Sequence, residues 1–162
     1  MKSDVFFSKL IATACGAGYW PWGPGTAGAL LGMAVWGVMF VVLQPLTLLA
    51  TMGVLIVVFT ALGTWATAKL IPEWGDDPQR VVIDEVVGVW IALLGASGWL
   101  SAVAALVLFR FFDIVKPLGI RALDRRKGAF WVMADDILAG VYALACICIL
   151  YFAEVFLFSF VD

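Results

Sequence analysis

Histidine is absent from this chain of 162 residues, and its absence excludes several kinds of site. No phosphohistidine can form, and zinc or copper would lack its commonest nitrogen ligand. Cysteine occurs three times, without a Cys-x-x-Cys pair and without the Cys-x5-Arg loop that activates a thiolate against phosphorus. Any metal site must therefore be built from oxygen ligands.

Charge is scarce. Charged residues make up 14% of the chain, whereas soluble domains carry about a quarter. Residues 10–68 and 86–109 contain none, and the mean hydropathy is +1.06. Residues 27–43 and 47–68 are each long enough to cross a hydrocarbon core as a helix. The composition predicts an all-α polytopic membrane helical bundle that forms one domain, residues 1–162.

The apolar runs and their breaks predict helices at 27–43, 46–71, 81–95, 99–116 and 135–158. Gln44-Pro45 should form a tight turn, and Pro72 should end the second span. Lys9 interrupts the apolar run that a cleaved signal would need. We therefore expect residues 5–19 to form a short helix at the membrane interface.

The run 86–109 allows two topologies, a single span or a helical hairpin (about 81–116) that breaks at residues 95–98, Gly-Ala-Ser-Gly. With the hairpin, all ten lysines and arginines fall on one side of the membrane. A single span would divide them between the two sides. The positive-inside rule favours the hairpin and predicts that the charged face, with the active site, is cytoplasmic.

Against this apolar background stand five carboxylates at the ends of apolar runs: Asp84, Glu85, Asp113, Asp135 and Asp136. Ionised groups near hydrocarbon are costly and usually functional. Helix capping is the alternative for the acid pairs, since acids complement the dipole of a helix N-terminus, but two adjacent carboxylates exceed that need. Hard oxygen ligands without histidine or thiolate favour Mg²⁺.

Arg110, Asp113 and Lys116 are spaced by three, so they share one helix face. The alternative is a set of intrahelical salt bridges, which contribute only about 0.3–0.5 kcal/mol per pair. The same face would suit a carboxylate that holds Mg²⁺ between two cations that hold phosphate oxygens.

Two further segments carry candidate phosphate contacts. In residues 16–28, GAGYWPWGPGTAG, Thr26 begins a helix whose free N–H groups could receive a phosphate oxygen, although a plain structural turn is the alternative. Arg125 lies in the basic cluster 125–127, which could instead anchor anionic lipids. Together the candidates predict metal-assisted attack on phosphorus by water, or by an aspartate through a phosphoenzyme.

Five segments in order, GAGYWPWGPGTAGAL, DDPQRVVIDEVVGVW, FRFFDIVKP, IRALDR and MADDILAG, resemble the bacterial phosphatidylglycerophosphatase A family. The resemblance runs from about Gly16 to Gly140. It implies an all-helical, Mg²⁺-dependent enzyme that converts phosphatidylglycerophosphate to phosphatidylglycerol. The chain departs from the family at Ala29, usually serine, at Gly119, usually proline, and at 127–131, where bulkier residues replace a glycine-rich stretch.

The predicted roles are Asp84 and Asp136 as catalytic groups, Glu85, Asp113 and Asp135 as metal ligands, and Thr26, Arg110, Lys116 and Arg125 as phosphate-binding groups. The expected partners are the phospholipid substrate and the bilayer of the bacterial inner (cytoplasmic) membrane, without nucleic acid; the oligomeric state is left open.

A small cation channel or transporter is the alternative function. It would require ionisable groups along the depth of the spans, whereas here they gather at one end. An alcohol phosphatidyltransferase is disfavoured because no DGxxAR-type motif occurs.

Overall fold

The computed structural model describes residues 2–76 and 78–158, and all regular structure in them is helical. The elements are α1 (Lys2–Ala12), a 3₁₀ turn η1 (Ala17–Tyr19), α2 (Pro24–Val42), α3 (Pro45–Trp74), α4 (Ile83–Leu93), α5 (Trp99–Val115), α6 (Ile120–Asp124) and α7 (Ala129–Phe158). The helices α2, α3 and α7 are long and apolar enough to cross a membrane. The predicted all-α membrane fold is confirmed.

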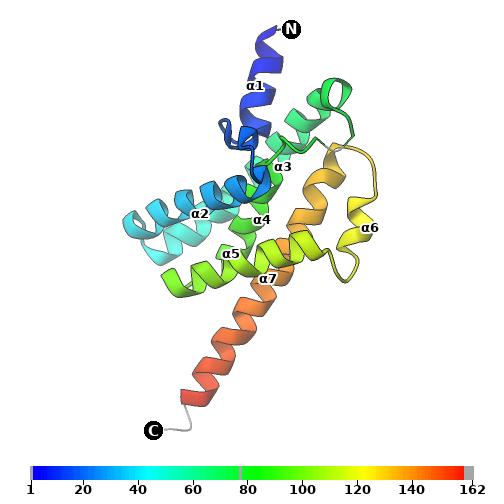
Figure 1. Cartoon of the computed structure of the whole chain (residues 1–162). Helices are drawn as coiled ribbons and strands as arrows, with labels where there is room; N and C mark the ends of the chain where they lie inside the picture. The colour runs from blue at the N-terminus through cyan, green and yellow to red at the C-terminus, as the bar shows by residue number, and fades with distance from the viewer. Residues whose placement is uncertain (1, 77, 159–162) are drawn as a thin grey trace.

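The short helix α4 forms the centre of the molecule (Figure 1). Beyond the two acids of its first turn its sequence is apolar on every side, so it is stable only when other helices surround it. All of its residues except Glu85 are buried, and it packs against α2, α3, α5 and α7.

The predicted hairpin is confirmed: α4 and α5 are separate helices joined by residues 94–98. The Ser101 hydroxyl accepts hydrogen bonds from the backbone N–H groups of Ser97 and Gly98, each at 3.0 Å. These bonds satisfy donors that the start of α5 would otherwise leave without partners.

Two glycines determine how α4 crosses α7. A Cβ atom on Gly140 would lie 2.3 Å from the backbone oxygen of Gly88, and a Cβ atom on Gly88 would lie 2.8 Å from that of Asp136. Only residues without a side chain allow the two backbones to approach so closely. Asp84 and Asp136 each precede their crossing glycine by four residues, about one helical turn. The crossing therefore brings these acids together.

Three predicted helix boundaries were wrong. The last helix begins at Ala129 rather than 135, directly after Gly128 with its φ of +116°, so Asp135 and Asp136 lie in its second turn. Helix α3 continues through Pro72, because a proline in the final turn displaces few helical hydrogen bonds, and ends at Trp74.

The third wrong boundary is that of the expected helix 5–19. It ends at Ala12, because Ala14, Cys15 and Gly16 all have positive φ angles. The backbone N–H of Val82 donates to the Ala12 oxygen at 2.8 Å, so this turn is held against the segment that leads into α4.

Candidate active site

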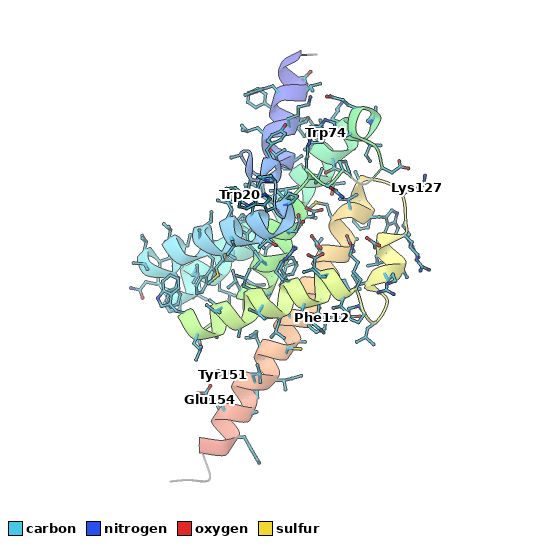
Figure 2. All side chains as sticks on the ribbon, viewed as in Figure 1. Trp20, Trp74, Phe112, Lys127, Tyr151 and Glu154 are labelled. Carbon is cyan, nitrogen blue, oxygen red and sulfur yellow. The ribbon has the colours of Figure 1, made fainter. Side chains whose placement is uncertain are left out.

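A cavity of about 450 Å³ opens where the start of α2, the start of α4 and the end of α5 meet α7. The loop before α4 and the α6–α7 connection complete its wall. Figure 2 shows oxygen and nitrogen atoms of several side chains gathered in this region, between α2, α5 and α7. The apolar helices therefore place a polar site at one end of the bundle.

Asp84, Glu85 and Asp136 form one part of this site, which we call the carboxylate trio. Each contributes one oxygen to a group in which all three lie within 4.8 Å of one another. Asp84 and Asp136 are 7% and 4% exposed. Within the trio, the Glu85 backbone N–H donates a hydrogen bond to Asp84 Oδ1 at 3.1 Å. Glu85 Oε2 is buried and has no hydrogen-bond partner among the described residues.

No lysine or arginine among the described residues forms an ion pair with the trio. Two carboxylates 4 Å apart repel by about 4 kcal/mol at an effective dielectric constant of 20. The trio is therefore unfavourable unless protons or a cation neutralise part of its charge. Its three oxygens could hold a metal ion, and the partnerless Glu85 Oε2 is a ready ligand.

Gly25 in the first turn of α2 makes room for this arrangement. A Cβ atom at this position would lie 2.1 Å from Glu85 Oε1 and 3.1 Å from Arg110 Nη1. The glycine thus lets α2 pass directly beside a buried carboxylate and a guanidinium group. Any larger residue would displace Glu85.

Asp113, Asp124 and Asp135 form the second part of the site, which we call the paired acids. Arg110 Nη1 lies 2.5 Å from Asp113 Oδ2, and the Lys116 ammonium lies 2.7 Å from Asp135 Oδ2 while also contacting Asp124. The paired acids are therefore neutralised by cations of the chain itself.

Lys116 connects three helices. It caps α5 in the left-handed conformation, with a φ of +49°, and pairs with Asp124 of α6 and Asp135 of α7. Burial alone would lower its pKa, but the hydrogen bonds to Asp124 and Asp135 outweigh this effect and raise the pKa above its usual value. Lys116 therefore stays charged and links the end of α5 to α6 and α7.

Seven of the nine predicted site residues line the cavity: Asp84, Glu85, Arg110, Asp113, Lys116, Asp135 and Asp136. Thr26 and Arg125 are exposed and do not belong to its wall. Their neighbours Gly25 and Arg126 do. The roles assigned to Thr26 and Arg125 stay predictions.

Arg126 is a cavity residue that the sequence reasoning missed. Its guanidinium carbon lies 4.3 Å from the centre of the Trp131 ring, a cation–π contact that holds the side chain against α7. The basic cluster 125–127 indicated that a cation of this segment could bind phosphate. Which of its three residues lines the cavity depends on where α7 begins.

The family model for phosphatidylglycerophosphatase A matches residues 10–151. This chain belongs to the phosphatidylglycerophosphatase A family. It is therefore an enzyme, a phosphatase that acts on a lipid, and its long apolar helices agree with membrane association.

Curated relatives carry two different substrate names. A putative phosphatidylinositol-3-phosphatase from Bacteroides thetaiotaomicron is 48% identical over 92% of this chain and 96% of its own length. Proteins named phosphatidylglycerophosphatase A from Haemophilus influenzae and Escherichia coli K12 are 39% and 36% identical, over 83% and 88% of this chain and 83% and 81% of theirs. No solved structure matches the chain.

Proposed function

We propose that this member of the phosphatidylglycerophosphatase A family removes the terminal phosphate of phosphatidylglycerophosphate, with Mg²⁺ held by the carboxylate trio. The observation that carries the proposal is the trio itself: three carboxylates that form no ion pair with a described lysine or arginine, of which Glu85 Oε2 also has no hydrogen-bond partner among the described residues. Hard oxygen ligands suit Mg²⁺, which usually needs only one or two protein carboxylates and keeps coordination positions for water and substrate.

When bound, the cation would offset phosphate charge and act as a Lewis acid. Asp84 and Asp136 reach the same space from α4 and α7, so either can accept the proton of the attacking water. Asp113 and Asp135 contact Arg110 and Lys116, and we propose that they orient these cations; their role as metal ligands stays a prediction.

Two guanidinium groups are placed to bind the phosphomonoester. Arg110 Nε is buried without a hydrogen-bond partner, so the side chain has donor capacity beyond its pair with Asp113. Arg126 faces the cavity from the α6–α7 connection and forms no ion pair with the described residues. Such fixed positive charge stabilises the phosphoryl transition state without reorganisation during the reaction.

Phosphate release from the purified protein tests the function. We expect release from phosphatidylglycerophosphate with Mg²⁺ and none in excess EDTA. The 48% identical relative from Bacteroides thetaiotaomicron makes phosphatidylinositol 3-phosphate the second candidate substrate, to be assayed in parallel. If the folded protein releases phosphate from neither lipid, the proposed function is wrong. If it releases phosphate from phosphatidylinositol 3-phosphate alone, that lipid is the substrate in place of phosphatidylglycerophosphate. Undiminished phosphate release in EDTA would contradict the proposed requirement for Mg²⁺.

We also propose that the site lies at the cytoplasmic face of the bacterial inner membrane. The hairpin supports this orientation, because it leaves every lysine and arginine on the side of the cavity. In a chain without its native cysteines, an impermeant thiol reagent should label Arg126→Cys from the cytoplasm and Ser97→Cys from the opposite side. Labelling of both from one side would contradict the topology.

A further inference from the structure

A second hollow, of about 730 Å³, adjoins the catalytic cavity. The two share Pro24, Pro78 and Gln79 as walls. Four of the residues that line the second hollow but not the catalytic cavity form what we call the Arg80 subsite: Tyr19, Trp20, Trp74 and Arg80. Figure 2 shows Trp20 beside the start of α2 and Trp74 at the end of α3, near α1. The two hollows are therefore direct neighbours on the same face of the molecule.

Arg80 is held in place from both backbone and side chain. Its guanidinium carbon lies 5.6 Å from the centre of the Tyr19 ring. Its backbone oxygen packs so closely on Gly18 that a Cβ atom there would lie 2.1 Å away. Arg80 is exposed, and a cation–π contact does not use its N–H groups, so these can still donate to an anion. No acid among the described residues forms an ion pair with it.

We propose that the Arg80 subsite binds the phosphodiester of the same lipid whose phosphomonoester occupies the catalytic cavity. The inference rests on the proposed function. Phosphatidylglycerophosphate carries both groups, joined by a short polyol, and so does phosphatidylinositol 3-phosphate. A substrate with two anionic groups fits two cationic subsites in neighbouring hollows. Arginine suits the diester because its planar fork can donate two parallel hydrogen bonds to phosphate oxygens.

The aromatic residues of the subsite fit the same ligand. Tryptophan and tyrosine rings prefer the level of the lipid head groups, where one side of the ring is apolar and the other is wet. Trp20 is 57% exposed, and Trp74 is partly buried beside it in the hollow. A lipid held here by its diester would keep its acyl chains in the bilayer while its terminal phosphate reaches the carboxylate trio.

Arg80→Ala in neutral detergent micelles tests the subsite, with Lys69→Ala as the control that removes an exposed cation outside both hollows. Phosphatidylglycerol probes the diester site alone, and its equilibrium binding is measured without turnover. Inorganic phosphate, as a competitive inhibitor, probes the monoester site alone.

For Arg80→Ala we expect the Kd for phosphatidylglycerol and the KM for phosphatidylglycerophosphate each to rise about tenfold, the loss of one charged hydrogen bond. The kcat and the inhibition by inorganic phosphate should stay within about twofold. Arg80→Lys, which keeps the charge but loses the fork, should give an intermediate Kd. Lys69→Ala should change none of these values.

Unchanged phosphatidylglycerol binding in Arg80→Ala would overturn the subsite, and so would equal weakening of phosphatidylglycerol and inorganic phosphate. An equal effect of Lys69→Ala would show attraction by bulk charge only, which also overturns it. If the wild-type protein binds phosphatidylglycerol through Arg80 but releases no phosphate from phosphatidylglycerophosphate, the proposed function fails while the diester subsite stands. The two failures are therefore distinguishable.

Discussion

The carboxylate trio and the paired acids lie in one cavity but are neutralised in different ways. Each paired acid contacts Arg110 or Lys116, so that part of the cavity is electrically balanced by the chain itself. The trio has no such partner among the described residues, and its members are held together by a helix crossing. The difference is the reason for proposing that the trio, and not the paired acids, holds the metal ion.

The helix packing explains why the trio persists despite its repulsion. Asp84 and Asp136 are brought together by the contact between Gly88 and Gly140, which lies among buried apolar residues of α4 and α7. Burial of one large apolar side chain contributes about 1.5–3 kcal/mol. Several such contacts can offset the repulsion among the three carboxylates. Fold stability thus maintains a locally unfavourable arrangement, as is expected at functional sites.

The largest effect should come from removing a charge of the trio. Asp136→Asn keeps the shape of the side chain but removes both a candidate metal ligand and a candidate base. We expect kcat/KM for phosphate release to fall at least a hundredfold. Asp76→Asn is the matched control, because Asp76 also lines the cavity but pairs with the exposed Lys127. Retention of more than about a tenth of the activity by Asp136→Asn would remove it from the chemistry.

A smaller effect, measured on stability, should follow from removing the cation that contacts two of the paired acids. Lys116→Met leaves Asp124 and Asp135 without their partner, and we expect the free energy of unfolding in detergent to fall by about 2 kcal/mol. The control Lys127→Met removes an exposed pair and should cost less than about 0.5 kcal/mol.

The pH dependence of that difference has a definite sign. Because the pKa of Lys116 is raised in the folded state, its stabilisation is fully present below the unfolded pKa of about 10.4 and is lost only as the pH rises through the higher folded value. The gap between wild type and Lys116→Met should therefore stay constant from about pH 7 to pH 9. A gap that closes within this range would mean that the ammonium is not held as the structure shows.

Local patterns predicted the membrane helices, the hairpin and most of the charged residues that line the cavity. The absence of charge in 86–109 and the placement of lysine and arginine were enough to bring the acids to one end. These features depend on composition and on segment length. They do not require knowledge of which helices touch.

The division of the acids into two groups could not be predicted, because it depends on contacts between distant segments. Asp135 and Asp136 are adjacent in sequence, yet one pairs with Lys116 and the other joins the trio, because successive residues of a helix point about 100° apart. Arg126 was missed for a related reason. Its cation–π partner Trp131 lies in the first turn of α7, which begins at Ala129 rather than at 135. A shift of a few residues in a helix boundary changes which member of a cluster faces the cavity.

The smallest effect separates these two adjacent acids most directly. In EDTA, Asp136→Asn removes repulsion from the trio and should raise the free energy of unfolding by about 1 kcal/mol. Asp135→Asn removes a partner of Lys116 and should lower it by about 1 kcal/mol. Thermal unfolding of both variants in the same detergent compares them. Equal signs would contradict the distinction between the trio and the paired acids.

Addition of Mg²⁺ extends that measurement. A ligand that binds only the folded protein raises its stability in proportion to the logarithm of its concentration above Kd. Asp135→Asn keeps the whole trio and should gain stability with Mg²⁺ as the wild type does, whereas Asp136→Asn should gain little. The two variants differ by one position in the chain and remove the same charge. If Mg²⁺ reverses which variant has the higher free energy of unfolding, the reversal would therefore come from the contacts of each carboxylate and not from net charge.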